Sequence, residues 1–191
     1  RAQAPQSTIS IAALPAVAHL WLAPRLPAIR AALPDHTISL TALETPPNLR
    51  RELFDISIFI DHPTGENTEQ IIAEDEVFPV CSPDLAKSLR TTDDLGFATL
   101  IHDATWAEDW QVWFDHAGIA QTGIKGPAFS LYAIAVQEAL ASAGVLMGHG
   151  ALIAPMLENS DLIAPFQTRA KTGKALVLRK QSTTSPHVAK V

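Results

Sequence analysis

The sequence STISIAALPA, at residues 7–16, establishes the type of fold. Residues 8–12 alternate polar and apolar side chains, which is the period of a strand with one buried face. Leu14 and Pro15 then end the strand, and proline is favoured in the first turn of a helix, where an N–H would have no partner. Residues 16–33 carry apolar side chains at three- and four-residue intervals. This spacing predicts an amphipathic helix that is kinked at Pro24.

The same pattern continues to residue 60. Alternation over 37–43 predicts a second strand, residues 47–54 a short helix, and the apolar residues 56–60 a third strand that is buried on both faces. Strands that alternate with helices through short connections form a parallel sheet. Ligands of such sheets bind beyond the carboxyl ends of the strands, so we expect a site near Pro15 and near Asp61.

Two extended apolar segments divide the rest of the chain, at 77–81 and 162–166. Between them the sequence predicts strands at 98–101, 128–130 and 145–148, and helices from Pro83 and at 108–117, 131–142 and 151–157. A last strand is predicted at 174–179. We therefore expect an α/β protein of two lobes, 1–78 with 163–191 and 79–162, joined by two crossings, which is the layout of hinge-closing binding proteins.

The composition excludes several classes of protein. With 47% hydrophobic and 18% charged residues among 191, the chain can form a packed core and is not disordered. Its net charge of −6 argues against direct binding of a phosphate backbone. No apolar run reaches the roughly 20 residues that cross a membrane. The polar residues 1–6 suggest no signal peptide, although a mature secreted protein would look the same, and the single cysteine fits a cytoplasmic protein.

Short motifs carry a resemblance to a known family. They are WLAPRL at 21–26, DISI at 55–58, VFPVCSP at 77–83, and GVLMG at 144–148 followed by APF at 164–166. In this order the chain resembles the effector-binding domain of LysR-type transcriptional regulators, in the subgroup related to the glycine-cleavage and β-lactamase regulators. The resemblance implies a type II periplasmic-binding-protein fold with two Rossmann-like lobes. It also implies a cytoplasmic homodimer or tetramer that contacts DNA only through a winged helix-turn-helix upstream of residue 1.

The resemblance also bears on individual residues. The resemblance implies pairing side by side, through the first helix of one copy and the second lobe of the other. This makes Leu20, Leu22 and Ile29 candidates for a dimer interface as well as for the core. The family often has a Ser or Thr hydroxyl where this chain has Ala16, and the subgroup commonly has Arg where it has Phe59. These two departures imply an effector that is held differently from those of the relatives. A final helix of the family would begin in the last ten residues.

Three predicted strand-to-helix junctions could bind a ligand, at residues 15–17, 130–132 and 149–151. Unpaired backbone N–H groups at a helix start attract an anion, so we expect a carboxylate. Ser130 could donate its hydroxyl or simply cap the helix, and Tyr132 could contact a ligand or only line the cleft. His19, His102 and His149 could contact a ligand or be ordinary packed residues. The candidate ligand contacts are Pro15, Ala16, Val17, Phe59, Asp61, His102, Ser130, Leu131, Tyr132, Gly148 and His149.

Catalytic, metal and cofactor sites are not expected. Cys81 lies in an apolar segment without a neighbouring base, no histidine pair has zinc-site spacing, and neither a Gly-x-Ser-x-Gly motif nor a glycine-rich phosphate loop occurs. The leading hypothesis is therefore a sensor domain that binds a small-molecule effector between its lobes and controls a DNA-binding module elsewhere in the protein. The alternative is a stand-alone solute-binding protein of a transporter.

Overall fold

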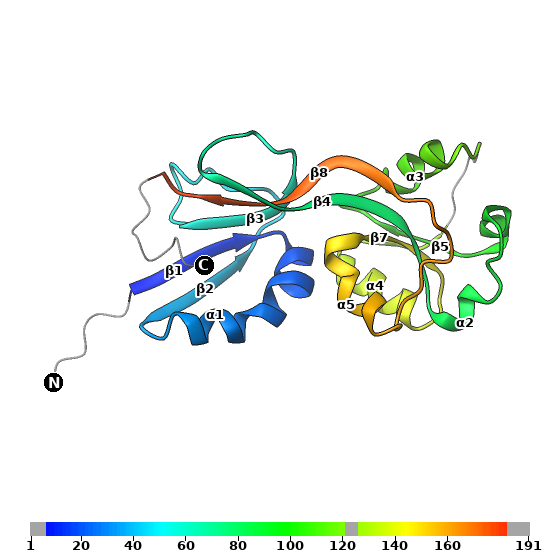
Figure 1. Cartoon of the computed structure of the whole chain (residues 1–191), viewed down its shortest axis with the longest axis horizontal. Helices are drawn as coiled ribbons and strands as arrows, with labels where there is room; N and C mark the ends of the chain where they lie inside the picture. The colour runs from blue at the N-terminus through cyan, green and yellow to red at the C-terminus, as the bar shows by residue number, and fades with distance from the viewer. Residues whose placement is uncertain (1–6, 121–125, 183–191) are drawn as a thin grey trace. The chain divides into compact units, whose positions relative to one another are not determined.

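The computed structural model describes residues 7–120 and 126–182 (Figure 1). The chain forms two compact units, unit 1 with Arg1–Glu74 and Gly173–Val191, and unit 2 with Asp75–Thr172. The boundaries predicted from the sequence lay at 78/79 and 162/163. The strands follow the order β2-β1-β3-β8-β4-β7-β5-β6. Strands β4 (Glu69–Val80) and β8 (Ala170–Lys180) each contribute residues to both units.

Unit 1 is built on the strands predicted at its start. Strand β1 (Ser7–Ala13) pairs in parallel with β2 (His36–Ala42) and with β3 (Ile56–Asp61), which confirms the parallel arrangement. Strand β8 returns to unit 1, as predicted for the last strand, and pairs with β3 in antiparallel fashion. Apolar residues on these strands, among them Ile11 and Ile58, form the core of the unit.

The first helical segment changes type along its length. It runs as a π-helix over Val17–Leu22, a 3₁₀-helix over Ala23–Arg25, and α1 over Leu26–Ala32. Pro24 has no N–H to donate to the carbonyl four residues earlier. The preceding residue, Ala23, donates instead to Ala18 five residues back. The kink predicted at Pro24 is therefore a change of helical hydrogen bonding.

The helix predicted at 47–54 is wrong, because these residues form turns. The Asn48 side chain accepts a hydrogen bond from the backbone N–H of Arg50, and the carbonyl of Asn48 accepts from Arg51 and Glu52. An asparagine side chain that accepts a hydrogen bond from the backbone N–H two residues later stabilises a turn and competes with helix formation.

Unit 2 contains the remaining strands and the longer helices. Residues 77–80 of β4 pair antiparallel with β7 (Val145–His149). Strand β7 pairs in parallel with β5 (Leu100–Asp103), and β5 pairs in parallel with β6 (Ala128–Phe129). The helices are α2 (Pro83–Ala86), the 3₁₀-helix Thr92–Phe97, α3 (Asp109–Ala117), α4 (Tyr132–Leu140) and α5 (Gly150–Glu158). Ser82 caps α2, and Gly118 ends α3 at φ 71°.

Aromatic residues of α3 fill the core of unit 2. Trp110, Trp113 and Phe114 are all buried. Both indole groups also donate hydrogen bonds, Trp110 to the carbonyl of Ile101 and Trp113 to that of Thr168. No helix in the described part of the chain has the length and apolarity needed to cross a membrane.

Candidate functional site

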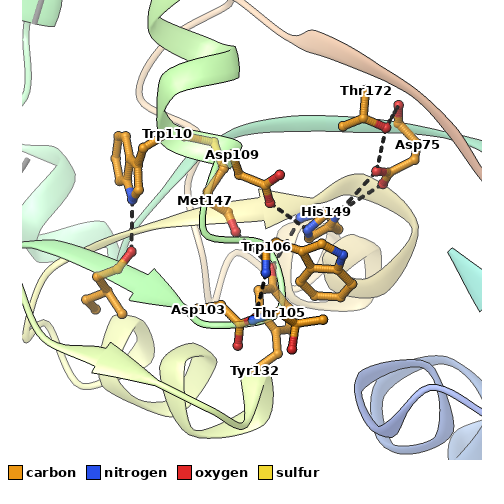
Figure 2. Close-up of polar contacts among 11 residues, drawn as sticks. Asp75, Asp103, Thr105, Trp106, Asp109, Trp110, Tyr132, Met147, His149 and Thr172 are labelled. Atoms are coloured by element: carbon orange, nitrogen blue, oxygen red, sulfur yellow. Dashed lines mark hydrogen bonds and ion pairs between the residues drawn. The ribbon is translucent and has the colours of Figure 1, made fainter. Parts of the chain in front are cut away.

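A cluster of buried polar side chains surrounds His149 in unit 2 (Figure 2). His149 is the last residue of β7, and its side chain is 1% exposed. Its Nδ1 atom lies 2.9 Å from Oδ1 of Asp75 on β4, and its Nε2 atom lies 2.9 Å from Oδ2 of Asp109 at the start of α3. The first contact is a hydrogen bond. The second is an ion pair whose angles do not fit a hydrogen bond. We call these residues the His149 cluster, which comprises Asp75, Trp106, Asp109, Tyr132, His149 and Thr172.

His149 carries a positive charge at neutral pH. Burial alone would lower the pKa of this imidazole, but the carboxylates of Asp109 and Asp75 outweigh burial and raise the pKa to about 9. The ring of Trp106 packs on the imidazole with 3.9 Å between the ring centroids, which adds an aromatic neighbour to the cation. The charge of His149 is therefore compensated inside unit 2.

Tyr132 fixes the junction between β7 and α5. Its hydroxyl donates to the carbonyl of Met147 at 2.9 Å and accepts from the backbone N–H of His149 at 3.1 Å. The residue is 3% exposed, and burial raises the pKa of the phenol. The hydroxyl that the sequence suggested for a ligand is thus engaged in two bonds within the unit.

Strand β5 ends at His102 and Asp103, beside the His149 cluster. One carboxylate oxygen of Asp103 accepts hydrogen bonds from the N–H groups of Thr105 and Trp106, at 2.8 and 3.3 Å. Burial raises the pKa of Asp103 and lowers that of the half-buried His102. His102 is therefore mainly neutral at pH 7, unlike His149.

The cluster contains residues that the sequence did not single out, namely Asp75, Trp106, Asp109 and Thr172. Asp75 stands in an acidic run that reads as an exposed break, although it is 3% exposed. Asp109 begins α3, a place where carboxylates are ordinary helix-start residues. A carboxylate at a helix start could have been considered as a partner for a strand-end histidine. No local sequence feature identifies Thr172 as a member of the cluster.

The candidates in unit 1 lie mostly in its core. Ala16, Val17 and Phe59 are between 0% and 4% exposed, and Pro15 is half-buried. Asp61 pairs with Arg179 at 2.8 Å, and Arg179 also bonds Glu69 at 3.0 Å. Burial would raise the pKa of Asp61, but Arg179 and the N–H of His62 lower it below its ordinary value. Asp61 is thus part of an internal ion-pair network.

The candidates at the start of α4 are more accessible. Ser130 and Leu131 are exposed, and Leu131 is the residue that caps the helix, without a side-chain hydrogen bond. Ser130 therefore precedes the cap, so it is not the plain helix cap that was its alternative interpretation. The hydroxyl of Tyr132 bonds Met147 and His149, the residues on either side of Gly148.

The residues predicted for an interface divide between core and surface. Leu20 and Leu22 are buried in unit 1, at 8% and 1% exposure. Ile29 is half-buried on α1, a helix without any buried residue, and His19 is exposed. The interface role of these leucines and of Ile29 stays a prediction.

Unit 1 also has a polar cavity of about 320 Å³. Its walls come from the loop at 47–50, from Glu66 and Thr68, and from residues 179–182. None of the ligand-binding residues predicted from the sequence lines it.

Metal and nucleophile chemistry find little support in the described residues. Within 7–120 and 126–182, no group of three or more His, Cys, Asp or Glu side chains is placed to hold a metal ion. Cys81 is buried, and burial raises its pKa to about 11, so its reactive thiolate form is scarce at neutral pH.

Comparison with curated proteins finds transcriptional regulators. The HTH-type transcriptional regulator DsdC of Escherichia coli K12 is 29% identical over 169 residues, which cover 83% of this chain and 54% of that protein. The glycine cleavage system transcriptional activator of the same strain is 30% identical over 172 residues, which cover 87% of this chain and 56% of that protein. The chain thus spans about half the length of these curated relatives.

Solved structures and a family model agree with this similarity. The effector domain of AmpR from Pseudomonas aeruginosa matches with a TM-score of 0.75 and 25% identity, over 96% of this chain and 91% of that one. The AmpR effector-binding domain from Citrobacter freundii has a TM-score of 0.79 at 20% identity, over 97% and 94%, and supports the fold alone. The family model described as the LysR substrate binding domain matches residues 2–191. The chain therefore belongs to the family of LysR substrate-binding domains and has their periplasmic-binding-protein-like fold.

Proposed function

We propose that this chain is the effector-sensing and dimerisation domain of a cytoplasmic transcriptional regulator, and that it is not an enzyme. The match of residues 2–191 to the family model carries the proposal. The relatives are named as transcriptional regulators, and this chain spans about half their length. In this proposal DNA is contacted by another part of the full-length protein. The relatives do not favour the alternative of a transporter's solute-binding protein.

The proposed effector is a small metabolite with a carboxylate. Helix α4 has nine residues and starts without a side-chain cap or an acidic residue in its first turn. The N–H groups at such a start favour a negative charge. The exposed hydroxyl of Ser130 lies directly before the cap and can add a hydrogen bond. The start of α5 also lacks a side-chain cap and an acidic first turn.

A thermal-shift screen against carboxylates, amino acids, sugars and cell-wall fragments tests the ligand class. A ligand at 100 times its Kd adds about 2.7 kcal/mol to the free energy of unfolding. For a domain of this size that is a rise of roughly 5–11 °C in Tm. We expect carboxylates to give the hits. A screen without any hit would refute effector sensing by this domain.

A pair of serine variants locates the site. Ser130→Ala should weaken binding of a carboxylate hit by roughly fivefold, the cost of about one hydrogen bond. Ser88→Ala removes another exposed hydroxyl of unit 2, one that donates to the carbonyl of Leu85, and should leave the Kd unchanged. Equal affinities for both variants would move the site away from the start of α4.

Dimerisation is tested separately on α1. We propose that α1 takes part in the dimer interface, with Ile29 at its surface and Leu20 and Leu22 supporting it from the core. Ile29→Glu should shift the sedimentation of the domain toward the monomer. Arg30→Glu, which changes the exposed neighbouring residue on α1, is the matched control for charge. An unchanged association constant for Ile29→Glu would exclude this face.

A further inference from the structure

The chain enters unit 2 at Asp75 and leaves it at Thr172, and these two residues bond each other. The Thr172 hydroxyl donates to Oδ2 of Asp75 at 2.8 Å. The side chain of Asp75 is 1% exposed, and Thr172 is half-buried. Strands β4 and β8 are therefore joined by side chains at the residues where each crosses the boundary of the unit.

The same carboxylate continues the connection to His149. Its other oxygen, Oδ1, lies 2.9 Å from Nδ1 of His149, while Oδ2 also lies within 3.2 Å (Figure 2). The opposite ring nitrogen of His149 pairs with Asp109, the first residue of α3. The backbone N–H of His149 donates to the hydroxyl of Tyr132, the first residue of α4. The next residue along the chain begins α5.

His149 thus links the two boundary strands to the first residues of three helices, through its ring, its backbone N–H and the following residue. A buried ion that loses a partner is left uncompensated, so states in which only one of these connections is broken are rare. A network of this kind responds as a unit, and its parts do not contribute independently.

We propose that Thr172, Asp75 and His149 form a relay that couples β4 and β8, where they enter and leave unit 2, to the starts of α3, α4 and α5. Because the proposed effector binds at the start of α4, this inference rests on the proposed function for its biological role. Effector binding at the start of α4 therefore affects β4 and β8, at the boundary of unit 2, through the relay.

Amide hydrogen exchange of the ligand-free domain, measured by NMR, tests the relay. Thr172→Val keeps the shape of the side chain and removes its hydroxyl. We expect exchange to become roughly tenfold faster, the loss of a hydrogen bond to a charged group, at residues 75–78 and 170–172 and also at the backbone N–H of His149, which donates to Tyr132 directly before α5. Thr172→Ser keeps a hydroxyl and should restore slow exchange at all three places.

The control is an exposed ion pair between the same segments of the chain. Glu76 and Arg169 approach to 3.0 Å, with side chains 37% and 42% exposed. Arg169→Gln removes this pair and keeps the Glu76 side chain, which lies beside Gly150 at the start of α5, so exchange of the His149 amide should stay unchanged. Faster exchange confined to residues near Thr172, or an equal effect of Arg169→Gln at the His149 amide, would overturn the proposal.

A double-mutant cycle provides a second measurement. Thr172→Val and Tyr132→Phe alter opposite ends of the relay, and independent sites would have multiplicative effects on exchange. We expect the double variant to fall short of the product of the single effects by at least about twofold. A multiplicative result would contradict the relay. Neither measurement uses a ligand, so a screen without hits counts against the proposed function and not against this coupling.

Discussion

The charge on His149 predicts a specific dependence of stability on pH. The pKa of this imidazole is about 9 in the folded protein, against an ordinary value of 6.5. The folded state binds the proton more tightly than the unfolded state does. Its contribution to stability is therefore complete below pH 6.5 and is lost progressively as the pH rises through 9. At 1.36 kcal/mol for each pKa unit, the loss is about 3 kcal/mol.

Urea unfolding between pH 6 and pH 9, followed by tryptophan fluorescence, measures this loss. Three of the four tryptophans, Trp106, Trp110 and Trp113, belong to unit 2, so the signal reports mainly on the unit that contains His149. Cys81 adds little slope below about pH 8, because its thiol has a pKa of 9.0 in the unfolded chain and burial raises it to about 11. Burial likewise raises the pKa of Tyr132 above its ordinary value of 10.0.

The variant His149→Gln separates this residue from other causes of pH dependence. It should be less stable at pH 6 by about 3–5 kcal/mol, because it leaves buried carboxylates without their cation. Its stability should then change little up to pH 9. His116→Gln alters an exposed histidine of α3 and should behave like the unchanged protein. If the unchanged protein and His149→Gln showed the same slope, the imidazole would be neutral and the ion pairs described here would be incorrect.

Three further substitutions test other contacts by thermal or urea unfolding. Tyr132→Phe leaves a buried carbonyl and a buried N–H without their partner and should cost about 1–3 kcal/mol, whereas a cost near zero would show that water replaces the hydroxyl. Gly148→Ala would place a Cβ atom 2.5 Å from a core side-chain carbon and should lower the free energy of unfolding by about 1–3 kcal/mol. Gly96→Ala, where the new Cβ would have no atom within 4 Å, should be neutral, and equal costs for the two variants would refute the packing argument. Arg179→Met breaks hydrogen bonds to two carboxylates and should cost roughly 2 kcal/mol or more, while Lys87→Met, at an exposed ion pair, should change nothing measurable.

The periodicity of the sequence predicted most of the elements because it records which faces are buried. The alternation at 8–12 and the aromatic spacing in 108–117 correspond to β1 and α3. The failure at 47–54 has a local cause. The Asn48 side chain and carbonyl bond nearby backbone N–H groups and hold a turn, and hydrophobic spacing does not register this competition.

The candidate site was only partly predictable, because its contacts join distant parts of the chain. The position of His149 at the end of a strand could be inferred from the apolar run before it. Its partner Asp75 lies 74 residues away, and Thr172 lies 97 residues beyond Asp75. Neither local propensity nor composition marks such pairs. Tyr132 was correctly placed at a helix start, but whether its hydroxyl would face a ligand or the backbone depends on the packing of β7.

The connectivity of the two units has a consequence for biosynthesis. Unit 2 is one uninterrupted stretch, Asp75–Thr172, whereas unit 1 is assembled from two stretches on either side of it. Strand β8 stands between β3 and β4 in the sheet order. During translation, unit 2 has its whole sequence once Thr172 has left the ribosome, but the sheet of unit 1 must wait for the residues that follow. Strands β1, β2 and β3 are therefore synthesised before unit 2, but their sheet is complete only after β8 has been synthesised. Until β8 pairs with β3, this edge of β3 is open to other chains.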